Sequence, residues 1–411
     1  MPKGLAEIGV SGLRRWGSYS TINEEFLGEL RGPLGVKKYR EMRDNDPVIG
    51  SVMLALEQMM MSVEWEVNGG APRENSFIKE CLEDMDDSWS DVLTNILSML
   101  TFGWALFEPV YKVRNGSVGK VKSRYSDKMI GWKKFGLRAQ DTLLDWKFAD
   151  NGEVIAIRQS APPNYGIIEI PMTRCLLFRT TSYKDNPEGR SLLRNAYRSY
   201  LFKKQLEEVE GIGIERDLTG MPVIYYPPEK DLSLLENASL RNYIDKILRS
   251  IAVHEQYGLA LPSDFEVKLL SSPGTRAIDT DAIIQRYDTR IAMTMLGQFI
   301  MLGSRRVGSF ALAKDQRALF NLAIDGWLGR VSDVMNHEAI PRLLRYNGLN
   351  ELQRPILTHR PVAVDLNDLA NYIKNLSGSM TILDKNPKLL DQMLRFVRLE
   401  QQTANIEDQV Y

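Results

Sequence analysis

The sequence has little of the material from which most metal sites and disulfide scaffolds are built. Its 411 residues include two cysteines, Cys81 and Cys175, and three histidines, His254, His337 and His359. Two distant cysteines exclude a disulfide scaffold and a four-cysteine zinc site, and three scattered histidines leave little material for a histidine metal cluster. We therefore expect an intracellular protein with no metal and no cofactor.

An excess of one charge and a long apolar run are also missing. Lys and Arg total 52 against 53 Asp and Glu, and a formal charge of −1 lacks the positive excess of a protein that coats nucleic acid. The longest strongly apolar stretch without charge, between Arg290 and Arg305, holds 14 residues, short of the roughly 18 that suggest a membrane span. The first residues mix charges with glycines and lack the apolar block of a signal peptide. We expect a soluble protein without membrane contact.

The motifs of common enzyme classes are absent as well. His337-Glu338 lacks the second histidine that a zinc-protease helix places four positions after the first. The segment from Gly211 to Arg216 lacks the third glycine of a dinucleotide-binding turn. We find no phosphate-binding lysine loop and no Gly-x-Ser-x-Gly nucleophile turn. We therefore predict no catalytic residues, and a protein that is not an enzyme.

Two charged clusters leave alternatives open. Asp84, Asp86 and Asp87 could bind a divalent cation, but a solvated acidic turn is the favoured interpretation. Segment 112–147 carries ten Lys or Arg against three Asp, which favours a solvated sheet face or a subunit contact. A nucleic-acid contact is the alternative for this segment, and with it a nucleic-acid-processing enzyme.

Hydrophobic periodicity predicts a mixed α+β protein. Seven glycines in residues 1–35 indicate a poorly packed arm. Helical spacing is found over residues 36–61 with a break at Pro47, over 75–82 and over 89–100. Alternation typical of strands is found over 62–67, 104–111, 143–148, 154–159 and 175–178, with a hairpin turn at Asp150-Asn151-Gly152.

The second half of the chain is predicted to be mainly helical. Asn186-Pro187-Glu188 combines a capping residue, a proline at the first position and an acid, which predicts the start of a helix reaching about residue 218. The remaining predicted elements are a strand at 220–228, a helix at 232–252, a strand at 265–270, a helix from Asp279 or Thr280, a glycine-bounded break at 303–308, a helix at 309–346, a strand at 355–364 and a helical tail at 366–400.

Four stretches, taken in order, resemble the portal proteins of tailed bacteriophages, and most closely the branch that includes the Mu-like portals. They are Tyr39-Arg-Glu-Met-Arg-Asp-Asn-Asp-Pro-Val-Ile-Gly-Ser with Glu64-Trp-Glu-Val67; Phe102-Gly-Trp-Ala-Leu-Phe-Glu108; Pro187-Glu-Gly-Arg-Ser-Leu-Leu-Arg194; and Leu296-Gly-Gln298 with Gly308-Ser-Phe-Ala-Leu-Ala313. Their order and spacing over about 39–346 carry the resemblance. The arm before residue 36 and the tail after 363 show none.

The resemblance implies a division of the chain into the parts of a portal subunit. These would be an N-terminal arm (1–35), an α/β wing (36–186), a first stem helix (187–216), a small α/β clip (217–278), a second stem helix (279–301), a tunnel loop (302–312), a helix and strand that return to the wing (313–362), and a small helical crown (363–411).

The resemblance also implies a function without covalent chemistry. The chain would form a dodecameric ring at one capsid vertex, in contact with the major capsid protein, and double-stranded DNA would pass through it during packaging and ejection. Terminase and a head-completion or adaptor protein would dock on the clip at Val223, Ile224, Tyr225 and Tyr226. Assembly would take place in the host cytoplasm, and the finished ring would be part of the virion. Another head-assembly protein, such as a minor head or connector protein, is the alternative.

In the tunnel loop, Arg305 and Arg306, with Lys314 one turn into the next helix, would touch passing phosphates. From the residues alone, the ordinary interpretation of the two arginines is a solvated turn between helices, in which they satisfy exposed carbonyl groups.

Overall fold

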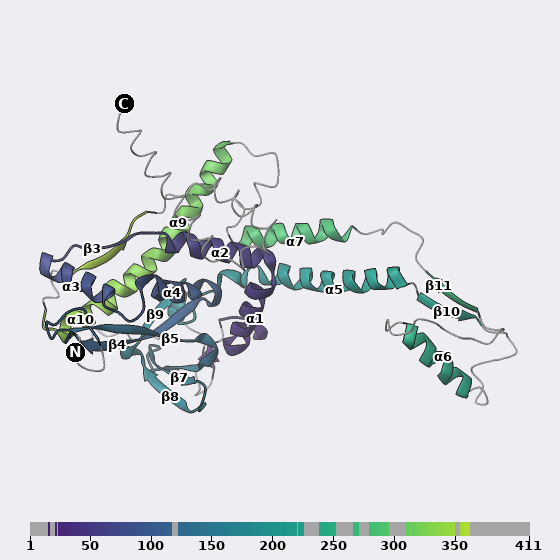
Figure 1. Cartoon of the computed structure of the whole chain (residues 1–411), viewed down its shortest axis with the longest axis horizontal. Helices are drawn as coiled ribbons and strands as arrows, with labels where there is room; N and C mark the ends of the chain where they lie inside the picture. The colour runs from purple at the N-terminus through teal and green to yellow at the C-terminus, as the bar shows by residue number, and fades with distance from the viewer. Residues whose placement is uncertain are drawn as a thin grey trace. The chain divides into compact units, whose positions relative to one another are not determined.

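The computed structural model shows a mixed α+β chain that divides into two compact units (Figure 1). The first unit comprises residues 1–197 and 289–411, and the second comprises residues 198–288. The structure describes residues 15–16, 21–22, 24–116, 122–219, 221–225, 238–251, 266–270, 279–295, 310–349 and 354–361.

The helices of the first half begin and end where local signals place them. α1 (Gly32–Asn45) and α2 (Pro47–Met61) are separated at Pro47, as predicted. The Asp46 carboxylate accepts the backbone N–H groups of Val48 and Ile49, which caps α2. α3 (Pro72–Glu83) and α4 (Trp89–Phe102) follow, and Ser88 and Asp91 form a reciprocal capping box at the start of α4.

A three-stranded antiparallel sheet lies at the centre of the first unit. β4 (Trp104–Val113) runs between β5 (Ile130–Arg138) and β9 (Leu176–Arg179), and helices α1, α2, α4 and α9 gather around the sheet (Figure 1). The predicted strands at 104–111 and 175–178 are confirmed. The sequence did not predict β5, because the adjacent Lys133 and Lys134 interrupt its alternation of apolar and polar residues.

A second three-stranded sheet packs against the start of β4. Its order is β6 (Leu143–Phe148), β7 (Val154–Ser160) and β8 (Ile167–Pro171), with the predicted turn before β7. Gly152 has a φ of +100° in that turn, a conformation that glycine adopts without strain. Trp104 of β4 joins the core residues of this sheet, among them Trp146, Ile157 and Ile170.

The late elements of the first unit return to an early strand, β3. α9 (Phe310–Val334) continues through a π-helical turn (Met335–Ala339) into α10 (Ile340–Tyr346). β12 (Ile356–His359) then pairs antiparallel with β3 (Trp65–Asn68). The remaining short elements are β1 (Arg15–Trp16), β2 (Thr21–Ile22) and the 3₁₀ turns η1 (Gly28–Leu30), η2 (Gln140–Thr142), η3 (Met172–Arg174), η4 (Tyr183–Asp185) and η5 (Leu192–Arg194).

The second unit contains a long helix pair and a small α/β part. α5 (Tyr197–Thr219) runs antiparallel to α7 (Thr280–Thr294), since Lys203 pairs with Asp288 at 2.6 Å while Thr280 donates a hydrogen bond to Glu210 further along. β10 (Met221–Tyr225) pairs antiparallel with β11 (Glu266–Leu270), and α6 (Ala238–Ile251) lies against β10. None of the helices that the structure describes is long and apolar enough to cross a membrane.

Two expectations about the chain path are wrong. The helix predicted to start at Asn186 begins only at Tyr197, because Gly189 takes a φ of +54° and turns the chain before the short η5 turn. Residues 24–35 are not a loose arm, since Leu30 is buried and Glu24 and Glu25 pair with Lys184 and Arg194 of the first unit.

Candidate functional site

The predicted docking strand forms, and it is one strand of a two-stranded antiparallel sheet. In the register of β10 and β11, Val223 lies opposite Lys268, Ile224 opposite Val267, and Tyr225 opposite Glu266. The Val223 and Ile224 side chains are half-buried and Tyr225 is about half exposed. Tyr226 lies outside the described residues. Such a small sheet needs packing from elsewhere to be stable, and α6 supplies part of it.

The predicted DNA-contacting residues are placed only in part. Arg305 and Arg306 lie outside the residues that the structure describes, and so does most of the predicted break at 302–312. Lys314 belongs to the first turns of α9. The role of these residues stays a prediction.

The basic segment begins with a cation that is buried. The Lys112 ammonium lies 3.2 Å from the Asp84 carboxylate and donates to the backbone carbonyls of Asp84 and Lys122. Asp84 also accepts from the Ser123 hydroxyl and the Arg124 N–H, each at 2.7 Å. Burial alone would raise the pKa of the Asp84 carboxyl, but these hydrogen bonds and the ammonium hold it below its usual value.

The interpretation of residues 84–87 as one solvated acidic turn is therefore wrong for its first member. Asp84 is buried and anchors the β4–β5 connection, whereas Asp86 and Asp87 are exposed. In the described part of the chain, no group of three or more His, Cys, Asp or Glu side chains is placed to hold a metal ion.

A second buried cation fixes the same connection to α3. Arg114 is 1% exposed, and its guanidinium pairs with Glu80 at 2.6 Å and with Asp127 at 2.9 Å. It also stacks over the Tyr125 ring at 4.1 Å from the centroid. Two further cations of segment 112–147 form ion pairs, Arg138 with Glu108 and Lys147 with Glu169. Part of the positive charge of this segment therefore holds the first unit together.

Two of the quoted sequence stretches meet at one point of the structure. Gly103 ends α4 with a φ of +94°, and a Cβ added there would overlap the carbonyl oxygen of Glu188 and lie 3.0 Å from the Arg190 nitrogen. A Cβ at Gly189 would overlap the Gly103 carbonyl oxygen in turn. Thr180 completes the contact, since its N–H donates to Gly103 at 3.0 Å and its hydroxyl to Arg190. We call this contact, between the backbone at Gly103 and the backbone of residues 188–190, the glycine junction.

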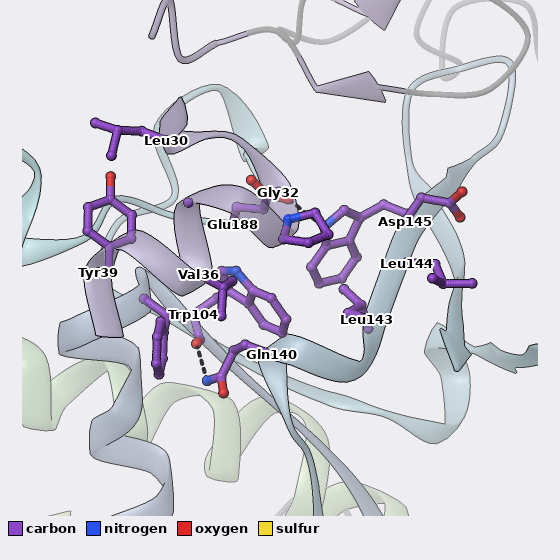
Figure 2. Close-up of a pocket in the computed structure, with 14 residues that line it drawn as sticks. Leu30, Gly32, Val36, Tyr39, Trp104, Gln140, Leu143, Leu144, Asp145 and Glu188 are labelled. Atoms are coloured by element: carbon purple, nitrogen blue, oxygen red, sulfur yellow. Dashed lines mark hydrogen bonds between the residues drawn. The ribbon is translucent and has the colours of Figure 1, made fainter. Parts of the chain in front are cut away.

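A small cavity lies beside the glycine junction (Figure 2). Its volume of about 40 Å³ has room for a few water molecules, whereas ligand pockets usually measure about 300 Å³ or more. Trp146 donates to the Glu188 carboxylate at 3.1 Å and packs edge-on against Trp104, with ring centroids 5.2 Å apart. Burial raises the pKa of Glu188, and the hydrogen bond from Trp146 only partly offsets this. The arrangement is that of a packed core.

The two cysteines are unsuited to nucleophilic chemistry. Burial raises the pKa of the Cys81 thiol to about 12 and that of Cys175 to about 11. Both side chains are fully buried as free thiols. A thiol reacts as its thiolate, so neither cysteine is poised for reaction near neutral pH.

The comparison with protein families decides which kind of protein has this architecture. The sequence model of the family described as "Portal protein of Mu bacteriophage" matches residues 36–386. The chain belongs to this portal family. It is thus a phage portal protein, that is, a head-tail connector and a component of the virion. Portal proteins are structural proteins and not enzymes.

Solved structures share the fold of this portal protein at low sequence identity. A chain from the neck of an empty gene transfer agent (GTA) particle, computed with C6 symmetry, is 13% identical with a TM-score of 0.51. The match covers 87% of this chain and 93% of that one. A chain from the neck of the native GTA particle, computed with C12 symmetry, is 12% identical with a TM-score of 0.50, and the match covers 84% and 89% of the two chains.

A further match is a portal protein of the HK97 family from Corynebacterium diphtheriae. It is 11% identical with a TM-score of 0.45, and the match covers 79% of this chain and 94% of that one. The search of curated proteins found no match.

Family membership sets aside both alternatives drawn from the sequence. Because the chain belongs to the portal family, it is neither another kind of head-assembly protein nor a nucleic-acid-processing enzyme. The quoted motifs have structural roles in this portal protein. Trp65 packs edge-on against Trp89, Glu108 pairs with Arg138 and Arg174, and Gly103 enters the glycine junction.

Sequence reasoning missed two buried ion pairs. Lys112 pairs with Asp84 at the end of α3, and Arg114 pairs with Glu80 within α3. A weak signal was present, because lysine and arginine within the apolar strand 104–113 and just after it must either face solvent or find buried partners.

Proposed function

We propose that this portal protein forms a dodecameric ring at one capsid vertex and that double-stranded DNA passes through the ring during packaging and ejection. Terminase, and later a head-completion or adaptor protein, would dock on it, and the major capsid protein would surround it. Assembly would take place in the host cytoplasm. The GTA neck chain computed with C12 symmetry supports twelve copies by analogy of fold.

We infer the parts of the subunit from the two compact units. The first unit, with its two sheets, corresponds to the wing, and the helix pair α5–α7 to the stem. The two-stranded β10–β11 sheet with α6 corresponds to the clip, and the segment before α9 to the tunnel loop. Residues 363–411, proposed as a crown, lie outside the described residues.

The observation that supports ring formation most directly is the apolar surface that α5 leaves exposed. Phe202, Val209, Ile212 and Ile214 are all between 42% and 64% exposed on this helix. A helix that is apolar beyond the stripe facing its partner needs further neighbours to cover it. Copies of the same chain, packed side by side around an axis, would provide those neighbours.

The first prediction concerns assembly. Purified protein at micromolar concentration should form closed rings with an axial channel, because the exposed apolar side chains of α5 become buried only between copies. Mass photometry would give the number of copies and electron microscopy would show the channel. A stable, well-folded monomer as the only species would contradict the proposed function.

The second prediction concerns the clip. Replacing Ile224 by Asp should weaken ring formation or terminase docking, because it puts a charge on a half-buried position of a two-stranded sheet with little packing of its own. Circular dichroism should show a folded protein, since the first unit does not contain this strand. Tyr225→Asp, at the more exposed neighbouring position, is the matched control for ring formation and should weaken it less. Normal rings and normal packaging by the Ile224 variant would contradict the assignment.

The third prediction concerns the channel. Replacing Arg305 and Arg306 by alanine should leave rings intact but alter packaging or the retention of packaged DNA, because arginines facing the channel would contact phosphates. The difference from wild type should shrink as salt rises, since these contacts are screened. Packaging assays at two salt concentrations test this. A ring structure with both side chains on the outer surface would show that the placement is wrong.

A further inference from the structure

A buried ion pair joins the helices α5 and α7. The Lys203 side chain on α5 is 3% exposed, and its ammonium lies 2.6 Å from the Asp288 carboxylate on α7. Glu207, on the next turn of α5 itself, lies 3.8 Å from the same ammonium, so this second contact does not depend on where α7 lies. Lysine is seldom fully buried unless it is paired. Because removing two charges from water costs about as much free energy as their attraction returns, a buried pair serves better to specify an arrangement than to stabilise it.

The apolar side chains of this helix pair do not select one sliding register. Exposed apolar side chains occur on more than one side of α5, at Phe202, Val209, Ile212 and Ile214. Phe202 stacks on Tyr287 of α7, with ring centroids 6.3 Å apart. Ile283, one turn earlier on the same side of α7, is half-buried as Tyr287 is. A slide of α7 by one turn would therefore exchange one apolar neighbour of Phe202 for another.

The polar contacts, in contrast, match in one register only. Lys203 meets Asp288, and further along the helices Thr280 donates a hydrogen bond to Glu210. One turn before Asp288, the same side of α7 carries Ile284. After a slide by one turn, the Lys203 ammonium would face an apolar side chain of α7 in place of a carboxylate. Removing one partner from a buried ion pair is strongly destabilising, so this register is disfavoured.

We propose that the Lys203–Asp288 pair is the register lock of the two helices, which permits one sliding position of α7 against α5 and excludes the position one turn away. A ring requires such a lock, because each copy must present the same surface to the next copy. A slide by one turn would displace α7 along α5 by about 5 Å. The inference rests on the proposed stem and ring, and it assigns to Lys203 and Asp288 the positioning of the stem helices.

Reporter cysteines measure the register directly. Phe202→Cys combined with Tyr287→Cys places two thiols together in the native register, whereas Phe202→Cys combined with Ile283→Cys does so only after a slide of one turn. In the unassembled chain, a short thiol-specific crosslinker should link the native pair at least about tenfold faster, since the buried ion pair opposes the slide. Mass spectrometry of the linked peptides identifies each product. The native Cys81 and Cys175 are buried as free thiols and should not react.

Moving the acid by one turn is the decisive change. Ile284→Asp together with Asp288→Ile exchanges two residues of α7 and leaves the composition of the chain unchanged. The Lys203 ammonium then meets its acid only in the slid register, so the cysteines at 202 and 283 should become the faster pair. The exchange, made without the reporter cysteines, should also raise the protein concentration needed for half-maximal ring assembly about tenfold, since the displaced helix misaligns the surface offered to the next copy.

Two control variants separate the ion pair from charge in general. Lys203→Arg keeps the cation and should keep the preference for the native pair of cysteines. Glu208→Met combined with Arg286→Leu removes an exposed anion from α5 and an exposed cation from α7. This matched control should keep the native preference as well, because neither side chain is buried in the contact.

The outcomes separate the register lock from the proposed function. An exchanged chain that still links the native pair faster, or that slides and yet assembles as wild type does, would overturn the inference. Lys203→Met combined with Asp288→Leu leaves no buried charge unpaired, so it tests the lock even if the exchanged chain does not fold. Its two reporter pairs should be linked at similar rates, and a strict native preference there would overturn the inference too. So would equal rates in the wild-type background or a lost preference in the Glu208–Arg286 control. A wild-type chain that never forms rings would overturn the proposed function and leave the measured register standing.

Discussion

Replacing Gly103 by alanine should lower the free energy of unfolding of the portal subunit by about 4 kcal/mol, the sum of backbone strain and overpacking. Gly103 has a φ of +94°, where an L side chain is strained, and an added Cβ would overlap the backbone carbonyl oxygen of Glu188. Backbone atoms cannot swing aside as a flexible side chain can. The contact between the end of α4 and the turn at Gly189 would have to open.

Urea unfolding of the unassembled chain, followed by tryptophan fluorescence, measures this effect. Gly326→Ala is the matched control, because Gly326 lies inside α9 with open space around it. There the same substitution should stabilise the protein by about 0.8 kcal/mol, since alanine is the better helix former. If both variants unfold at the same urea concentration as wild type, the glycine junction does not constrain the fold.

Replacing Lys112 by methionine should lower the free energy of unfolding by about 3 kcal/mol, the usual cost of removing one partner from a buried ion pair. Methionine keeps much of the volume of the side chain but leaves the Asp84 carboxylate buried without its ammonium partner. The carbonyls of Asp84 and Lys122 would lose a donor as well. Lys134→Met, at an exposed position of β5, should change the stability by less than about 0.5 kcal/mol.

The effect of the Lys112 change should depend on pH. The pKa of Asp84 is lowered in the folded protein from its ordinary value of 3.8. The stability contributed by its ionised form is therefore fully present above that ordinary value and is lost as the pH falls through the folded-state pKa. Urea unfolding of wild type and variant should differ most near neutral pH and converge in acid. A difference that grows in acid would contradict the role assigned to this pair.

Local sequence signals were sufficient where the decisive interactions are also local. Pro47 separates two helices because a proline removes a backbone donor and favours a first helical position, and Asp46 beside it caps the second helix. The turn ending at Gly152 also follows from residues within a short window. In each case the chain needs no distant partner to adopt the predicted conformation.

Local signals failed where a distant segment competes for the same backbone. Asn186-Pro187-Glu188 has the composition of a helix start, yet Asn186 accepts the Glu188 N–H within a turn. The chain turns here because Gly189 packs on Gly103, more than eighty positions earlier in the sequence. The strand β8 was missed for a related reason, since its consecutive exposed isoleucines show no alternation of apolar and polar residues.

The sequence by itself determined the α+β class, most helices and strands of the described part, and the resemblance to portal proteins, because these depend on periodicity and on the order of short motifs. Only the tertiary structure decided what the charged and glycine residues do. Lys112 and Arg114 could equally have faced DNA or solvent, and only the position of α3 beside β5 makes them buried partners of acids. Gly103 and Gly189 likewise become a packing contact only when the end of α4 meets the turn after β9. Burial and ion pairing are properties of segments brought together from far apart in the chain, and no short window of sequence contains that information.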